Sequence, residues 1–153
     1  MRAAPKFYCA CWKLDAGQDE IEDLLGGLRK KAPGAVLQVF SSTTAPNPAL
    51  VSMIAAQTLS AMQSDSLIAE RPEVDLLLRL ASTRQIGEAF KRIGYKEKGR
   101  KLFMAVASQN RSPLVKLEKE VSRDKRFSEL PSRRLDGDDL DKVEKAALLS
   151  ARI

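Results

Sequence analysis

The segment 50–63 contains no charged residue, and this restricts the fold of the 153-residue chain more than any other feature does. An N-cap asparagine and a first-turn proline, Asn47-Pro48, precede it and predict a helix that runs to about Gln63. Apolar residues recur along this segment at helical spacing, at Leu50, Val51, Ile54, Leu59 and Met62. A surface helix normally has one charged or polar side. We therefore expect this helix to be buried on more than one face or to be covered by a partner.

Short apolar runs and amphipathic segments make up most of the remaining chain. Four apolar runs predict β-strands, at residues 6–14, 35–42, 73–81 and 101–108. Four amphipathic segments predict further helices, at residues 19–32, 82–94, 112–127 and 136–152. In the second of these helices, Ser82 and Gln85 have the spacing of a capping box, and Gly94 is expected to close the helix as a C′ glycine.

The predicted fold is a single α+β domain that spans residues 1–153. With this length and 44% hydrophobic residues, the chain can bury one sizeable core. Alternating strands and helices suggest parallel βαβ units, but strands this few and short do not decide between parallel and antiparallel pairing. We expect a small mixed or antiparallel sheet of about four to five strands flanked by helices.

Positive charge is concentrated in the second half of the chain. Residues 1–76 carry 7 basic and 9 acidic side chains, whereas residues 79–134 carry 16 basic and 6 acidic ones. Such a field favours a polyanionic partner, because each neutralised phosphate releases condensed counterions. A solvated basic surface is the alternative explanation. Near the basic residues, Tyr95 is the best-placed platform for stacking an RNA base, and a contact that closes the preceding helix is its alternative role.

The residues that common enzymes and metal sites require are absent. The chain has no histidine, which removes Ser-His-Asp and Cys-His catalysis and most transition-metal sites, and it has no Gly-rich phosphate loop. The acidic clusters at residues 19–23 and 136–141 lie at predicted helix starts, where negative charge is stabilising. Cys9 and Cys11 are two residues apart in a predicted strand and are expected to be reduced rather than to form a disulfide or a zinc site. We predict a protein that is not an enzyme and has no cofactor, metal or small-molecule substrate.

The sequence also lacks membrane and secretion signals. No run of apolar residues reaches the roughly 18 to 20 that a membrane span requires. The N-terminus has no basic region followed by a continuous apolar stretch, as a signal peptide would have. With reduced cysteines, this pattern predicts a cytoplasmic protein without a membrane partner.

Two segments in the middle of the chain match a known pattern. The first is residues 47–51, Asn-Pro-Ala-Leu-Val, followed by Ala55-Ala56, which leads into the charge-free helix. The second is residues 76–90, in which a predicted strand leads into a helix through Thr83-Arg84-Gln85-Ile86. In this order and spacing the chain resembles the TPRKB family of accessory subunits of the KEOPS tRNA-modification complex, over roughly residues 35–108.

The resemblance implies a noncatalytic, regulatory subunit that docks on the N-terminal lobe of the small kinase-like ATPase of KEOPS and supports its activity. The complex makes threonylcarbamoyladenosine in tRNA, and archaeal members of the family are implicated in holding the 3′ CCA end. The kinase contact is expected at exposed members of the Asn47 helix and at the Thr83–Ile86 junction: Asn47, Leu50, Val51, Ile54, Thr83, Gln85 and Ile86. The tRNA contact is expected at Arg84, Lys91, Arg92, Lys96, Lys98, Arg100 and Lys101.

Two other classes of function compete with this one. A stand-alone basic RNA-binding module would bind RNA tightly and in a salt-dependent manner without any protein partner. A small enzyme that uses its carboxylates or its two cysteines would lose activity on a single substitution with folding intact. The sequence motifs favour the binding subunit over both.

Overall fold

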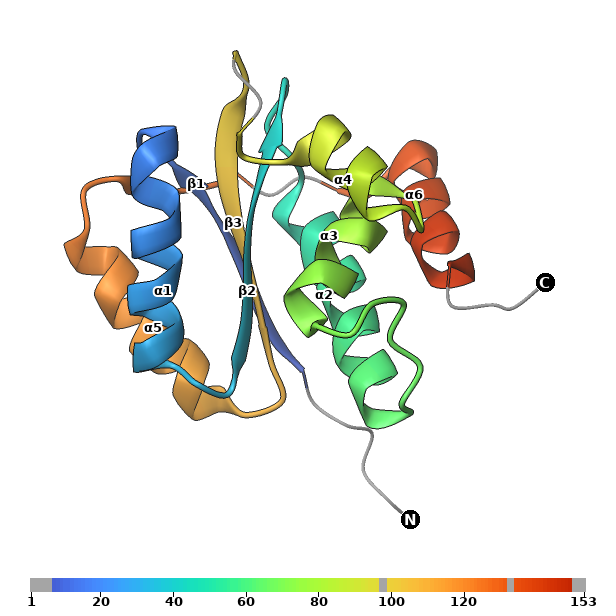
Figure 1. Cartoon of the computed structure of the whole chain (residues 1–153), viewed down its shortest axis with the longest axis horizontal. Helices are drawn as coiled ribbons and strands as arrows, with labels where there is room; N and C mark the ends of the chain where they lie inside the picture. Colours follow the sequence, from blue (N-terminus) through green and yellow to red (C-terminus); the bar gives the residue numbers. More distant parts are fainter. Residues whose placement is uncertain (1–6, 97–98, 132–133, 150–153) are drawn as a thin grey trace.

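The fold was analysed in a computed structural model that describes residues 7–96, 99–131 and 134–149 (Figure 1). Within these residues the strands are β1 (Tyr8–Leu14), β2 (Ala35–Ser42), β3 (Lys101–Ser108) and β4 (Phe127–Glu129). The helices are a single 3-10 turn η1 (Gln18–Glu20), α1 (Ile21–Lys31), α2 (Pro48–Gln63), α3 (Pro72–Ala81), α4 (Ile86–Ile93), α5 (Arg111–Arg123) and α6 (Gly137–Leu148). The predicted α+β class is confirmed.

The four strands form one antiparallel sheet in the order β2-β3-β1-β4. Because β1 and β2 are both antiparallel to β3, they run parallel to each other with β3 between them. In the same way β3 and β4 run parallel with β1 between them. The chain therefore contains two interleaved split βαβ units, β1-α1-β2 and β3-α5-β4, the arrangement of ferredoxin-like folds. Helices α2, α3 and α4 are inserted between the two units.

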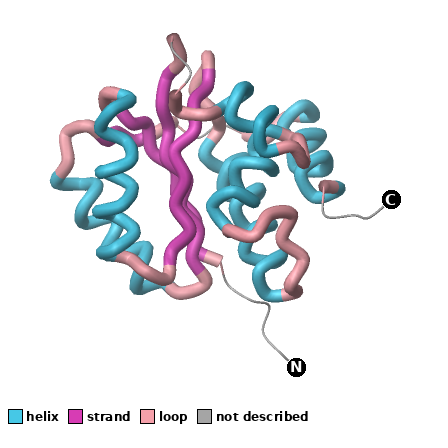
Figure 2. Tube along the Cα trace, viewed as in Figure 1, coloured by secondary structure: helices cyan, strands magenta, loops and turns pink. Residues whose placement is uncertain are grey.

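Both faces of the sheet are covered. Helices α1 and α5 lie on one face, and α2, α3, α4 and α6 lie on the other (Figures 1 and 2). Along β3, Leu102, Met104 and Val106 belong to the core under α1 and α5, whereas Phe103, Ala105 and Ala107 belong to the core under α2. Because successive side chains of a strand point to opposite faces, a strand covered on both faces is apolar throughout. This explains why β2 and β3 are continuous apolar runs in the sequence.

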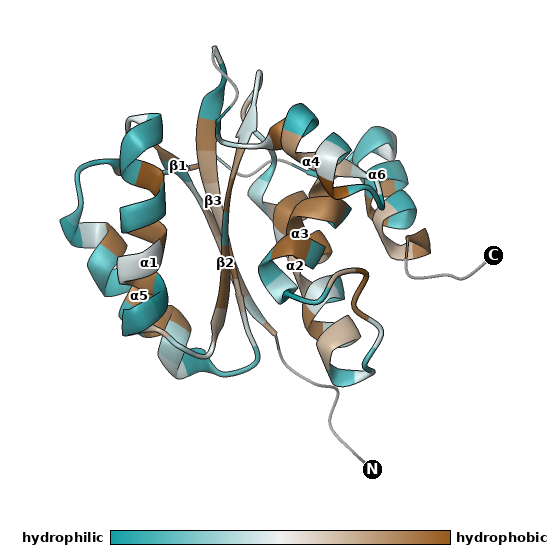
Figure 3. Ribbon diagram, viewed as in Figure 1, coloured by the Kyte–Doolittle hydropathy of each residue, from teal (hydrophilic) through white to brown (hydrophobic). Residues whose placement is uncertain are grey.

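The charge-free helix α2 is buried on more than one face, as its composition predicted. It packs on β1 and β3 with one side and against α3 and α6 with others. The sheet residues beneath it include the small side chains of Cys11, Ala105 and Ala107, which leave room for the helix to lie close to the strands. Figure 3 shows the hydrophobic residues concentrated in the sheet, α2 and α3, while α1 and α5 carry many hydrophilic residues on their outer sides.

The prediction of a strand at residues 73–81 is wrong, because this segment forms the helix α3. Pro72 occupies the first turn, and Ser82 closes the helix in a left-handed conformation with φ 57°. The run of leucines suggested a strand because α3 is enclosed by α2, α4, α6 and β2, so apolar residues occur on nearly all of its sides. Leu76, Leu77 and Leu78 are each at most 1% exposed.

Two charged residues of α3 form a buried network that connects three helices. The carboxylate of Asp75 accepts hydrogen bonds from Thr58 Oγ1 of α2 at 2.7 Å, from the Ile68 backbone N–H at 2.9 Å and from Arg79 Nε at 2.7 Å. Arg79 also donates from Nη1 to the Ala146 carbonyl oxygen of α6 at 3.1 Å. Asp75 and Arg79 are 0% and 2% exposed. The network attaches the loop after α2 and the last helix to α3.

Other predicted helix boundaries differ from the observed ones because of the local backbone conformation and capping. Ser82 is the C-cap of α3 and not the N-cap of α4, whose N-cap is Gln85 without a side-chain capping bond. Gly94 follows α4 with an extended backbone, φ −66°, rather than as a left-handed C′ residue. The helix predicted to end near Phe127 ends at Arg123, and the next residues form the short strand β4, which the sequence analysis missed.

Candidate docking surface

A pocket of about 300 Å³ lies between the first turns of α2, the end of α3, α4 and α6. Its floor is apolar and includes Leu50, Val51 and Ile54 of α2 together with Phe40 of β2. Its wall includes residues from the end of α3 and from α4: Leu80, Ala81, Ser82, Arg92 and Ile93. The pocket therefore brings together parts of the two segments that carry the resemblance, although residues 57–75 separate them in the sequence; the Thr83–Ile86 junction itself does not line it.

The members of the Asn47 helix that were expected to be exposed are buried. Asn47 is 1% exposed, and its side-chain Oδ1 accepts a hydrogen bond from the Ala49 backbone N–H at 3.1 Å, so it is a structural N-cap. Leu50, Val51 and Ile54 are 7%, 2% and 3% exposed. They form the floor of the pocket rather than an outer surface. The expectation that these four residues are exposed is therefore wrong.

The turn between α3 and α4 is accessible. Thr83 is half-buried, and its side-chain oxygen accepts a hydrogen bond from the Gln85 backbone N–H at 3.2 Å, which shapes the turn. Gln85 is exposed, and Ile86 is 50% exposed. One turn later Phe90 is 43% exposed, while Ala89 is buried in the core. Only part of the apolar side of α4 is therefore buried in the core of the protein.

The sequence analysis missed two members of this surface. Phe90 was not among the predicted contacts, because helical spacing alone does not separate core positions from docking positions. Lys142 of α6 lines the pocket. No local signal identifies it, because it reaches the site only through the packing of the last helix. Arg92 stands at the same pocket, donates from Nη1 to the Ala81 carbonyl oxygen at 3.1 Å and pairs with Glu88 at 3.4 Å.

The described basic residues that were expected to contact tRNA belong to separate groups. Arg84, Lys91 and Arg92 belong to α4 and its N-terminal turn, and all three are exposed. Arg100 and Lys101 line a second pocket, of about 330 Å³, together with Lys13 of β1. Lys13 was not among the predicted residues, because it is far away in the sequence.

Tyr95 and Lys96, which follow α4, contact Glu22 of α1. Lys96 Nζ is 3.9 Å from Glu22 Oε1. The Tyr95 hydroxyl donates to the same oxygen at 3.3 Å, and burial and the nearby Glu22 carboxylate raise the tyrosine pKa. Tyr95 is half-buried and packs against the core under α1, which is a different contact from the predicted one with the preceding helix. Lys98 lies outside the described residues.

The cysteines have no activated partner. Cys9 and Cys11 are free thiols in β1. Burial raises the pKa of Cys9 to about 11 and that of Cys11 to about 12. Since the thiolate is the nucleophile, neither residue is reactive at neutral pH. In the described part of the chain no group of three or more His, Cys, Asp or Glu side chains is placed to hold a metal ion.

No family model and no curated protein matches this chain. No helix among the described residues is both long enough and apolar enough to cross a membrane. What the surface offers chemically is an apolar pocket beside exposed Ile86 and Phe90, with Arg92 and Lys142 at its edge. These groups suit the binding of another macromolecule.

Proposed function

We propose that this chain is a noncatalytic, cytoplasmic binding subunit of the KEOPS type, which docks on the small kinase-like ATPase of that complex and helps to recruit tRNA. The observation that supports the proposal is that parts of two segments line one pocket, Leu50 and Val51 from residues 47–51 and residues 80–82 from the segment 76–90, although the Thr83–Ile86 junction does not line it. These are the same two segments whose order and spacing resemble the TPRKB family. Their convergence gives the resemblance a common spatial location, which two unrelated matches would lack.

The kinase contact is centred on the solvent side of α4. Ile86 and Phe90 are four positions apart, so they lie on the same side of the helix and offer an apolar anchor to the partner. The neighbouring pocket, with its apolar floor, accepts a side chain of the kinase lobe. Arg92 and Lys142 add positive charge at the edge, which favours an acidic rim on the partner.

The tRNA contact uses Arg84 and Lys91 of α4 and the group of Lys13, Arg100 and Lys101 at the end of β1 and β3. These side chains act on the phosphate backbone, so losing one weakens binding uniformly and flattens its salt dependence. Lys96 contributes less, because Glu22 partly offsets its charge.

The test of the kinase contact is calorimetric titration of the protein with the cognate KEOPS kinase subunit. Ile86→Glu is expected to weaken binding about tenfold or more, because it places a charge in the apolar anchor. Met62→Glu is the matched control, since Met62 is 37% exposed but lies at the opposite end of α2, about 18 Å along the helix axis from Leu50. Equal binding by wild type and Ile86→Glu contradicts the proposed contact.

The competing function is a stand-alone RNA-binding module, which the density of basic side chains favours. Mobility shifts with full-length tRNA and with tRNA lacking its terminal CCA, at two salt concentrations, separate the two. Loss of affinity on CCA removal supports the recruitment role. Equal, strongly salt-dependent binding to both RNAs, combined with no binding to the kinase, favours the stand-alone module.

A further inference from the structure

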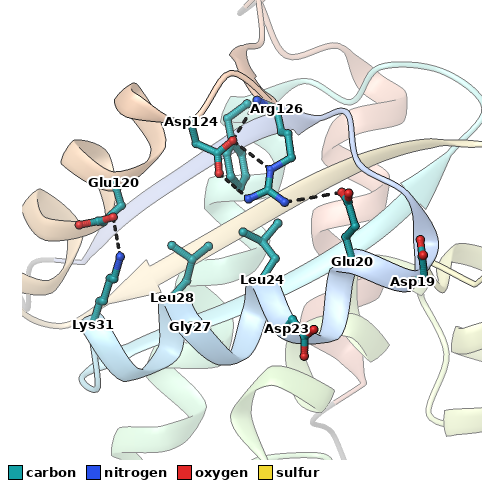
Figure 4. Close-up of a pocket in the computed structure, with 11 residues that line it drawn as sticks. Asp19, Glu20, Asp23, Leu24, Gly27, Leu28, Lys31, Glu120, Asp124 and Arg126 are labelled. Carbon is teal, nitrogen blue, oxygen red and sulfur yellow. Dashed lines mark hydrogen bonds and ion pairs between the residues drawn. The ribbon is translucent and has the colours of Figure 1, made fainter.

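A second groove lies on the opposite face of the sheet from the candidate docking surface. It runs between α1 and the C-terminal end of α5 and has a volume of about 620 Å³. Leu24 and Leu28 of α1 and Phe127 of β4 form its apolar floor. Figure 4 shows Leu24 and Leu28 pointing from α1 toward the α5 side of the groove. A groove of this size holds several side chains of a partner.

Ion pairs bound the groove at its two ends (Figure 4). At one end Lys31 Nζ is 2.8 Å from Glu120 Oε2. At the other end Arg126 pairs with Asp124 at 2.7 Å and with Glu20 at 3.5 Å. Hydrogen bonds from Lys31 and Arg126 lower the pKa values of Glu120 and Asp124 respectively. All these side chains are partly exposed, so the pairs exchange partners at little cost.

The groove has the opposite sign of charge to the protein as a whole. The chain carries a net charge of +6, yet the side chains that line the groove include five carboxylates and only two cations. The acids of the first turn of α1 are stabilised by the helix dipole. The same dipole disfavours Glu120 and Asp124, because they lie in the last turn and at the C-cap of α5. Their ion pairs with Lys31 and Arg126 offset this cost and hold both carboxylates at the groove.

A pair of glycines lies in the middle of α1, and no close neighbour in the described structure requires either of them. Gly26 and Gly27 lie inside the helix, where glycine is the least favourable residue after proline. A Cβ atom added at either position would meet no atom within 4 Å, so neither glycine is required by a close neighbour. Gly27 lines the groove and Gly26 does not. A missing side chain at Gly27 lets a partner approach the backbone of α1 closely.

We infer that the groove between α1 and α5 is a docking site for a cationic amphipathic helix of another protein. The apolar side of that helix rests on Leu24, Leu28 and Phe127, above the bare backbone of Gly27. Its lysine or arginine side chains pair with the carboxylates along the two sides of the groove, in competition with Lys31 and Arg126. Since this face is opposite α4, both partners bind at the same time.

Fluorescence anisotropy with a labelled synthetic amphipathic helix of leucine and lysine tests the inference. The wild-type protein is expected to bind it at a single saturable site, and less tightly at higher salt. Gly27→Leu fills the groove and is expected to weaken binding about tenfold. Gly26→Leu is the matched control, because it makes the same change one residue away, outside the groove, and is expected to leave binding unchanged. Thermal unfolding by circular dichroism verifies that both variants are folded.

A second pair of measurements separates docking from general attraction to an acidic surface. The double variant Asp19→Lys/Asp23→Lys alters the charge of the groove without changing its floor, and it is expected to weaken binding of the lysine peptide. An otherwise identical leucine–glutamate peptide is expected not to bind. The inference is overturned if the wild type does not bind the cationic peptide, if the anionic peptide binds equally, or if Gly27→Leu binds as tightly as Gly26→Leu.

Discussion

Removing the carboxylate of Asp75 is expected to be the most destabilising single polar substitution in α3. In Asp75→Ala, the buried Arg79 guanidinium, the Thr58 hydroxyl and the Ile68 backbone N–H all lose the carboxylate that accepts their hydrogen bonds, and Arg79 keeps its bond to the Ala146 carbonyl oxygen. Leaving one member of a buried ion pair without its partner costs about 3 to 5 kcal/mol. For a domain of this size each kcal/mol lowers the melting temperature by roughly 2 to 4 °C, so Tm falls by roughly 6 to 20 °C.

The assay is urea unfolding at neutral pH, followed by far-ultraviolet circular dichroism. Arg79→Met is expected to cost less than Asp75→Ala, because the carboxylate keeps the Thr58 and Ile68 donors, and the double variant should cost less than the sum of the two. Glu88→Ala is the control, since Glu88 and Arg92 have the same four-residue spacing but are 44% and 52% exposed, and it should cost about 0.3 to 0.5 kcal/mol. Equal costs for Asp75→Ala and Glu88→Ala would refute the reasoning.

Three further predictions concern other parts of the chain. Because the pKa values of Cys9 and Cys11 rise from 9.0 to about 11 and about 12 on folding, their contribution to stability is complete below pH 9 and is lost as the pH rises through the folded values. Urea unfolding across this range should therefore show a steeper loss than in a Cys9→Ala/Cys11→Ala variant, and parallel curves would contradict the assignment. Gly26→Ala should raise the free energy of unfolding by about 0.5 to 1 kcal/mol, because alanine favours the helix and its Cβ meets no neighbouring atom. A lower free energy of unfolding in calorimetry would contradict this and would mean that another atom occupies the position of the added Cβ. Gly94→Ala should lower the free energy of unfolding by about 1 to 3 kcal/mol, because the added Cβ would overlap the carbonyl oxygen of Phe90 in the preceding turn. An unchanged free energy of unfolding in the same experiment would show that the turn adjusts without cost.

The sequence predicted the elements whose signals are local. Asn47-Pro48 marked the start of α2, and the apolar runs of β2 and β3 gave their bounds as residues 35–42 and 101–108. It failed at residues 73–81, because a helix enclosed by other helices loses the polar side that identifies helices in a sequence. The four-residue spacing of Asp75 and Arg79, together with Pro72, was the available signal for a helix.

The candidate docking surface was predictable only in part. The resemblance implied that the Asn47 helix and the Thr83–Ile86 junction belong to one site, whereas the pocket is lined by that helix and by residues 80–82, just before the junction. It did not indicate which members are exposed, because Leu50 and Ile86 are both apolar residues at helical spacing yet are 7% and 50% exposed. Exposure depends on which neighbouring element covers each helix. Lys142 could not be predicted for the same reason, since it belongs to α6, which is distant in the sequence and reaches the pocket only through tertiary packing.

The strand order β2-β3-β1-β4 has a consequence for how this protein is made. Strands β1 and β2 do not pair with each other, and both pair with β3, which begins at Lys101. While a ribosome is synthesising the first hundred residues, the growing chain therefore cannot form any hydrogen bond of its sheet. The apolar strands β1 and β2 therefore remain unpaired until β3 has been synthesised. Synthesis of the last third of the chain thus closes the sheet, and a fragment that ends before β3 has helices but no sheet on which to pack them.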